Sequence, residues 1–148
     1  GMPLGGLVGP AWVMNWPPGG HASTFGGNPV SCRAAMATLD LVEREYMANA
    51  DARGKQVGDA LVRLANDNPR FANPRGLGLM RAVDVVNGDQ PDPAARKTIL
   101  QSAFDRDLIL LGCGQSGIRL CPGLCVSAEV FDAAVKILSE VAEIASKS

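Results

Sequence analysis

A stretch in the middle of the chain, RGLGLMRAVDVV at residues 75–86, carries a clear secondary-structure signal. The glycines of Arg75-Gly76-Leu77-Gly78 indicate a turn, because glycine adopts backbone conformations that other residues avoid. Residues 79–86 are rich in β-branched and other apolar side chains, which favour a strand. Asn87-Gly88-Asp89 then turns the chain again. We therefore expect a strand over residues 79–86.

Helix signals lie on both sides of this strand. Asn28-Pro29 predicts a helix start, because the Asn side chain accepts from an unpaired backbone N–H and Pro needs no partner at the first position. A second helical stretch follows over residues 49–66, and Asp92-Pro93 predicts the start of another helix. Apolar residues recur at helical spacing in these segments, and those expected to face a core are Ala35, Leu39, Val42, Tyr46, Val57, Leu61, Leu64, Ile99, Leu100, Ala103 and Phe104.

The last third of the chain predicts a hairpin and one more helix. Two short apolar runs, residues 108–111 and 118–121, are joined by a flexible, glycine-rich segment. Ser127 predicts the N-terminus of the last helix, and Glu129 in its first turn is favoured by the helix dipole. Helices and strands in this irregular order predict an α+β fold, with a small sheet covered by helices on one side.

The composition is that of a globular protein with a real core. The chain has 148 residues, of which 47% are hydrophobic and 20% charged, and a net charge of -1. Its 14 lysines and arginines are scattered, so we expect no nucleic acid partner. Its apolar runs are far shorter than the roughly 20 residues that cross a bilayer, so we expect no membrane segment. Four cysteines are few for a disulfide scaffold, which favours a reducing, cytoplasmic location.

Several catalytic and metal-binding patterns are excluded. The one histidine, His21, is not on a strand-turn-helix nucleophile elbow, so we interpret it as a loop residue with a local hydrogen bond. Cys113, Cys121 and Cys125 do not have a zinc-finger or zinc-ribbon spacing, so we interpret the cysteines as buried, reduced thiols. The glycines at 76 and 78 do not open a helix after a strand, which excludes a dinucleotide fingerprint.

Two features remain as candidate ligand sites. In the segment from His21 to Pro29, two hydroxyl side chains and two glycines lead into a helix, and glycine lets backbone N–H groups approach a phosphate. The alternative is an ordinary helix start. Arg119 lies on an expected strand between apolar neighbours, and its planar guanidinium suits a carboxylate. The alternative is a solvated charge on an edge strand.

Four segments together resemble one protein family. They are Met2-Pro3-Leu4-Gly5, Thr24-Phe25-Gly26-Gly27-Asn28-Pro29, Arg75-Gly76-Leu77-Gly78-Leu79-Met80 and Ile118-Arg119-Leu120-Cys121-Pro122. In this order and spacing they resemble class-III, pyridoxal-phosphate-dependent aminotransferases, especially the 4-aminobutyrate and ornithine types. The resemblance covers essentially the whole chain. It implies the α+β C-terminal small domain of a fold-type-I enzyme over residues 49–148, preceded by a loop and linking helix from the large cofactor-binding domain over residues 1–48.

The resemblance also implies roles for particular residues. Thr24 would reach the phosphate of pyridoxal phosphate in the neighbouring subunit of a dimer, with Ser23 and Phe25 beside it in the cofactor loop. Arg119 would receive the carboxylate of the substrate. The complete enzyme would move an amino group from an amine or amino acid to a 2-oxo acid.

One departure from the family changes the expectation for the isolated chain. The lysine that forms the Schiff base lies upstream of the Met-Pro-Leu-Gly segment in this family, and Lys55, Lys97, Lys136 and Lys147 do not match its context. We therefore expect an aminotransferase fragment that is inactive alone. The alternatives are a non-catalytic, self-associating domain that binds no cofactor, or a fragment of a related mutase, racemase or decarboxylase.

Overall fold

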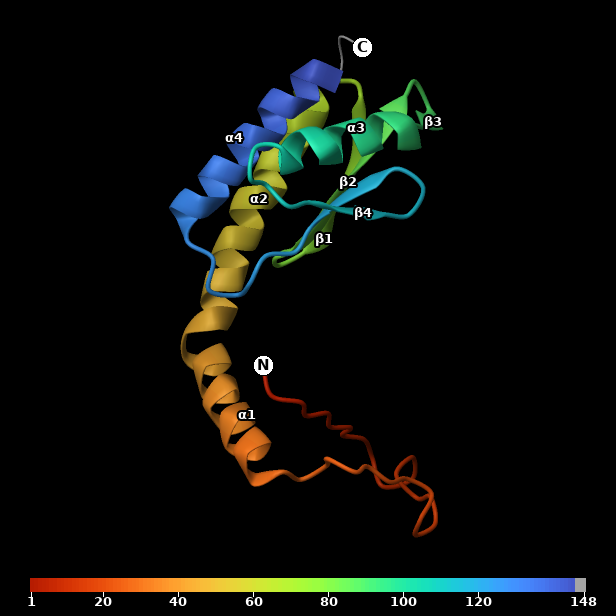
Figure 1. Cartoon of the computed structure of the whole chain (residues 1–148), viewed down its shortest axis with the longest axis vertical. Coiled ribbons are helices and arrows are strands. Elements are labelled where there is room, and N and C mark those ends of the chain that lie inside the picture. The colour runs from red at the N-terminus through yellow and green to blue at the C-terminus, as the bar shows by residue number, and fades with distance from the viewer. Residues whose placement is uncertain (146–148) are drawn as a thin grey trace. The chain divides into compact units, whose positions relative to one another are not determined.

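The computed structural model describes residues 1–145 (Figure 1). The chain divides into two compact units, residues 1–45 and the residues from Tyr46 onward. In chain order the elements are α1 (Pro29–Leu41), the π-helical segment η1 (Val42–Tyr46), α2 (Met47–Asp67), β1 (Phe71–Leu77), β2 (Met80–Asn87), β3 (Gln90–Pro91), α3 (Pro93–Phe104), β4 (Leu111–Cys113), β5 (Gly117–Leu120) and α4 (Ala128–Ala145).

The first unit consists of a long loop followed by α1. The helix starts as its sequence predicts: the Asn28 side chain accepts from the backbone N–H groups of Val30 and Ser31, and Pro29 occupies the first position. The helical spacing places Leu39 on the apolar side of α1, yet its side chain is 62% exposed. Residues 1–45 therefore bury little of this helix by themselves.

The second unit contains an antiparallel sheet with the strand order β1-β2-β5-β4, and β3 pairs with the end of β2. Strand β2 confirms the strand predicted from its apolar residues. The predicted turn over Arg75–Gly78 is wrong in position, because Arg75–Leu77 belong to β1 and the chain turns at Gly78. A bulge lies between Ala72 and Arg75, where Asn73 has a φ of 52°. It interrupts the alternation of side chains along β1, so the sequence of β1 does not show a strand pattern.

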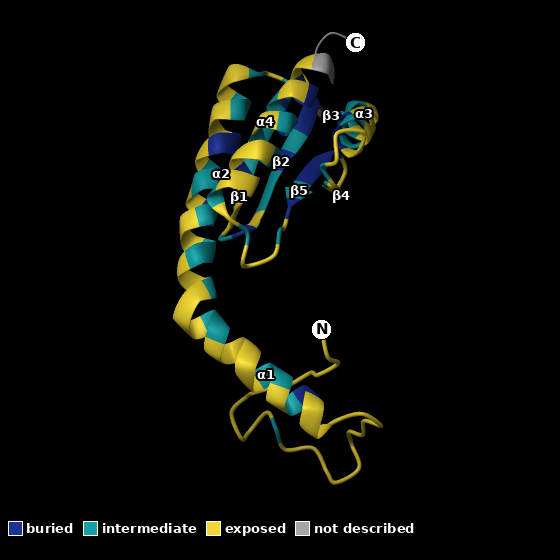
Figure 2. Cartoon of the chain, turned by 60° about the vertical axis from the view of Figure 1, so that its left-hand side comes forward, coloured by how far each residue is buried: buried dark blue, intermediate teal, exposed yellow. Residues whose placement is uncertain are grey.

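Helices α2, α3 and α4 share one core with one face of the sheet (Figure 2). Val83 and Val85 of β2 point to this face, and Val83 pairs directly with Ile118 of β5. The helices contribute buried apolar residues to the same core, namely Val57, Leu61, Ile99, Ala103, Phe131, Leu138 and Val141. The α+β fold with helices on one side of the sheet is therefore confirmed.

Two local predictions need adjustment in the second unit. The hairpin of β4 and β5 is confirmed, but its first strand begins only at Leu111. Phe104, which the helical spacing places on the buried side of α3, is 61% exposed because α3 ends there. Two apolar residues about one turn earlier, Ile99 and Leu100, do pack on the core.

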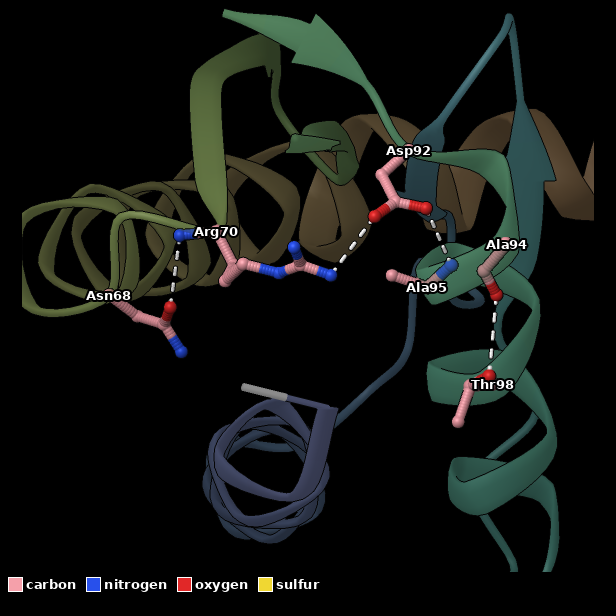
Figure 3. A network of polar contacts seen from close by, with 6 residues as sticks. All are labelled: Asn68, Arg70, Asp92, Ala94, Ala95 and Thr98. Atoms are coloured by element: carbon pink, nitrogen blue, oxygen red, sulfur yellow. Dashed lines mark hydrogen bonds and ion pairs between the residues drawn. The ribbon is translucent and has the colours of Figure 1, made fainter. Parts of the chain in front are cut away.

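A polar network fixes the start of α3 to the end of α2 (Figure 3). Asp92 accepts from the Ala95 N–H at 2.8 Å with one carboxylate oxygen and pairs with Arg70 at 3.0 Å with the other. The Arg70 N–H in turn donates to the side chain of Asn68, which follows the last residue of α2. The predicted helix cap at Asp92 is confirmed, and its second bond ties together segments distant in sequence.

No helix in the described part of the chain is both long and apolar enough to cross a membrane.

Candidate functional site

The glycine-rich loop before α1 is folded by its own side chains. The Ser23 hydroxyl oxygen accepts from the Gly26 N–H at 3.1 Å. A Cβ at Gly26 would lie 3.1 Å from the Ser23 Cβ, and Gly27 has a φ of 74°, so both positions suit glycine. Because the Ser23 oxygen acts as the acceptor, its O–H remains able to donate to an anion.

A hollow of about 400 Å³ opens on this loop within residues 1–45. It is lined by Leu4, Gly5, Gly6, Leu7, His21, Ser23, Phe25 and Gly26. The structure thus brings Ser23 and Phe25 together with His21 and with the Met-Pro-Leu-Gly segment. Thr24 does not line the hollow, and its side chain is exposed.

The Arg119 side chain lies on β5, directly opposite Ala82 on β2 and Leu111 on β4. Ile118 and Leu120, its strand neighbours, point into the core, so Arg119 points to the face that the helices leave open. Its Nε is buried and has no hydrogen-bond acceptor in the described part of the chain. A buried, unpaired donor of this kind carries an energetic penalty that an acceptor on a ligand would remove.

Arg119 borders two hollows. One, of about 320 Å³, is mostly apolar and is lined by Leu108, Ile109, Leu110, Leu111, Leu120, Cys121, Pro122, Val126, Val130, Phe131 and Ala134 as well as Arg119. The other, of about 440 Å³, lies on the open face of the sheet and is lined by Arg75, Gly76, Leu77, Met80, Arg81, Ala82, Cys113 and Arg119. Arg119 is the charged residue common to both.

A second arginine on the open face, Arg75, is held by a carboxylate. Its Nη2 pairs with Asp84 Oδ1 at 2.8 Å, and its Nη1 donates to the Asn73 carbonyl at 3.0 Å. The Asn73 amide donates to the other Asp84 oxygen at 3.2 Å. The hydrogen bond to Asp84 raises the pKa of Arg75 above its usual value, and the negative charge of Asp84 adds to this effect against partial desolvation. Sequence patterns missed this cluster, since the bulge in β1 brings its members together.

The cysteines and the acidic residues form no metal site in the part of the chain that is described. All four cysteines are free thiols, as expected. The expectation that they are buried is wrong: Cys121 and Cys125 are exposed in the loop after β5, and Cys32 and Cys113 are only partly buried. This loop connects β5 to α4 at the surface, and its two cysteines face solvent.

Solved structures of known proteins share this fold. A lysine aminotransferase from M. tuberculosis matches 86% of this chain with a TM-score of 0.77 and 31% identity, and the match spans 29% of that chain. A phospholyase from Arthrobacter, solved with phosphoethanolamine, matches 82% of this chain with a TM-score of 0.78 and 28% identity, over 30% of its own length.

Sequence comparisons give the same result. The family model described as aminotransferase class-III matches residues 1–142. An acetylornithine aminotransferase from Bifidobacterium longum is 36% identical over 95% of this chain and 32% of that protein. A 4-aminobutyrate aminotransferase from Mycobacterium leprae is 37% identical over 95% of this chain and 33% of that protein.

The chain belongs to the class-III aminotransferase family. It spans about a third of the length of these curated relatives.

Proposed function

We propose that this chain supplies one part of a pyridoxal-phosphate-dependent aminotransferase, which moves an amino group from an amine or amino acid to a 2-oxo acid. The observation that carries the proposal is the family match over residues 1–142, which includes both candidate ligand sites. In this proposal, residues 1–48 belong to the large cofactor-binding domain and residues 49–148 form the small domain. The reducing, cytoplasmic location expected from the cysteines is part of the same proposal.

The loop before α1 has the chemistry of a phosphate contact. Thr24 is exposed, and the Ser23 O–H can donate while its oxygen accepts from Gly26. Both hydroxyls can bind phosphate oxygens, and Phe25 supplies an apolar side chain beside them. We propose that Ser23, Thr24 and Phe25 contact pyridoxal phosphate of a partner subunit in a homodimer. When bound, this cofactor serves as the electron sink of the reaction.

Arg119 is proposed to hold the carboxylate of the substrate. Its guanidinium provides a bidentate contact, and its buried Nε lacks an acceptor among the described residues. A fixed carboxylate restricts the orientation of the adjacent amino-bearing carbon, which is the contribution that positioning makes to rate.

We propose that the chain alone does not transaminate. Lys55, Lys97 and Lys136 lie on α2, α3 and α4, and the loop of residues 1–28 contains no lysine. Lys147 lies outside the described residues. The three lysines on helices lie neither in the cofactor loop nor next to it in the sequence. This supports the inference that none of the three forms the Schiff base.

The test is a titration of pyridoxal phosphate into the chain, followed by the ³¹P resonance of the cofactor and by mass spectrometry after borohydride reduction. We expect a ³¹P shift that Thr24→Ala reduces, and no reduced adduct. Thr38→Ala is the matched control, because its hydroxyl donates within α1 to the Ala34 carbonyl. An adduct on one lysine would refute the inference that no lysine of this chain forms the Schiff base, and an unchanged ³¹P resonance in the parent would favour the non-catalytic domain.

A second candidate function has one observation in its favour. The Arthrobacter phospholyase shares this fold at a TM-score of 0.78, so the fold is compatible with other chemistry than amino transfer. A fragment of a related lyase, mutase, racemase or decarboxylase would retain the cofactor loop. The ³¹P experiment would then give the same result, and the substrate of the complete enzyme would distinguish the two.

A further inference from the structure

The open face of the sheet carries a row of residues in register across its strands. Arg75 on β1 pairs with Ala82 on β2, Ala82 pairs with Arg119 on β5, and Arg119 pairs with Leu111 on β4. Paired residues in an antiparallel sheet point to the same face. Arg75 and Arg119 therefore flank Ala82, at a backbone separation of about 10 Å, which is two strand spacings.

The middle of this row is a small residue. Ala82 has only a methyl group, and the next residue along β5 on this face, Gly117, has no side chain. A Cβ at Gly117 would lie 3.0 Å from Asp84 Oδ1 and 2.8 Å from Cys113 Sγ, so these side chains lean over it. The space over Gly117 is thus taken by Asp84 and Cys113, whereas Ala82 lines the hollow of about 440 Å³ that both arginines border.

The charges around the hollow are unequally compensated. Arg75 is paired with Asp84 at 2.8 Å, whereas the Nε of Arg119 has no acceptor in the described residues. Arg81 also borders the hollow, but it donates to the Gly76 and Gly78 carbonyls, and it pairs with Leu120 on the face covered by the helices. Arg75 and Arg119 therefore face the single carboxylate of Asp84, and Arg81 adds a further positive charge at the border of the hollow, which favours an anionic ligand such as a carboxylate.

We propose that Ala82 forms the floor of a carboxylate site between Arg119 and Arg75, in which Asp84 and Asn73 hold Arg75 as the second contact of the same carboxylate. The inference rests on the proposed role of Arg119 and adds Arg75 as a contact and Ala82 as the residue that sets the available space. Arg75 retains free N–H groups for this contact, because a guanidinium has five donors and two are in use. Asp84 is a positioning residue that acts through Arg75.

The experiment uses the 148-residue chain and propionate as the probe, and it follows the Nε–H resonances of the arginines by NMR. We expect both Arg75 and Arg119 to shift with one common affinity. Ala82→Leu should weaken binding about tenfold or more, since its side chain fills the hollow, and Arg75→Gln should weaken it about tenfold by removing a charge-assisted contact. Ala133→Leu, at an exposed position of α4, is the matched control and should bind as the parent does.

The positioning role of Asp84 has its own readout. Asp84→Ala should abolish the propionate-dependent shift of Arg75 while that of Arg119 remains, and Arg75→Lys should restore part of the affinity that Arg75→Gln loses. If Arg119 shifts but Arg75 does not, and Ala82→Leu binds as tightly as the parent, the inference is wrong while the role of Arg119 stands. If neither arginine shifts, both are wrong. Should Ala82→Leu fail to fold, the Arg75 variants decide the question alone.

Discussion

Glu129 shows how a single exposed side chain can make the stability of α4 depend on pH. A hydrogen bond with the Ser127 side chain lowers the pKa of Glu129 below its usual value of 4.5, and a hydrogen bond with its own backbone N–H adds to the effect. The ionised form is thus favoured by folding. The stability that it contributes is present above the usual pKa and is lost as the pH falls through the lowered pKa of the folded state.

We expect Glu129→Gln to lower the Tm at pH 7 and to lower it less at an acidic pH, because the parent carboxyl loses its charge as the pH falls through the lowered pKa of the folded state. Thermal unfolding of both proteins at the two pH values checks this. Glu143→Gln, near the other end of α4, is the control, because a negative charge there is not favoured by the helix dipole. Equal losses of Tm at both pH values would mean that Glu129 acts through packing instead of charge.

At the same scale, the sequence predicts contacts between near neighbours and misses those set by strand pairing. The caps at Asn28 and Asp92 are predictable because each side chain bonds to a backbone N–H two or three residues later. The pairing of Arg75 with Asp84 is not, because it depends on the register of β1 against β2. A candidate ligand residue on a single element can therefore be proposed from the sequence, whereas the residues that it meets on adjacent strands cannot.

Helix α2 is held close to the turn between β1 and β2 by a glycine. A Cβ at Gly54 would lie 2.4 Å from the Gly78 carbonyl oxygen, which is backbone and cannot move aside cheaply. A Cβ at Gly58, one turn later, would approach only the flexible end of Arg81, at 3.2 Å.

The two glycines of α2 should therefore respond oppositely to alanine. We expect Gly54→Ala to destabilise the chain by about 1–3 kcal/mol through overpacking. Gly58→Ala should be neutral or stabilising by up to about 1 kcal/mol, because alanine has the higher helix propensity. Urea unfolding of the two variants measures the difference, and equal effects would show that α2 does not approach the turn as closely as described.

The start of α3 depends on one carboxylate with two partners. Asp92→Ala removes both the helix cap and the ion pair with Arg70, and we expect a loss of about 1–2 kcal/mol. Asp92→Asn keeps a side-chain oxygen for the cap and should lose less. Urea unfolding separates these cases; if the two variants lose the same amount, the ion pair with Arg70 rather than the cap stabilises this end of the helix.

At the scale of the whole molecule, the two units differ in what they bury by themselves. Residues from Tyr46 onward form a core of helices on a sheet, while residues 1–45 leave Val30, Met36 and Leu39 of α1 mostly exposed. The fold class of the second unit follows from hydrophobic periodicity, which depends only on local sequence. The apolar residues of α1 show the same periodicity and yet stay mostly exposed, so periodicity identifies the apolar side of a helix without establishing its burial.

The bulge in β1 determines where a charge is placed. Between the pairs Ala72–Asp84 and Arg75–Ala82, β1 advances by one residue more than β2 does. Because side chains alternate along a strand, a version of β1 without the extra residue would direct the Arg75 guanidinium into the apolar layer under α2. A deletion at Asn73 or Pro74 would thus leave the composition of the sheet almost unchanged and yet turn the β1 side chains beyond the deletion to the opposite face, which makes the spacing of this short segment as important to the open face as the arginines themselves.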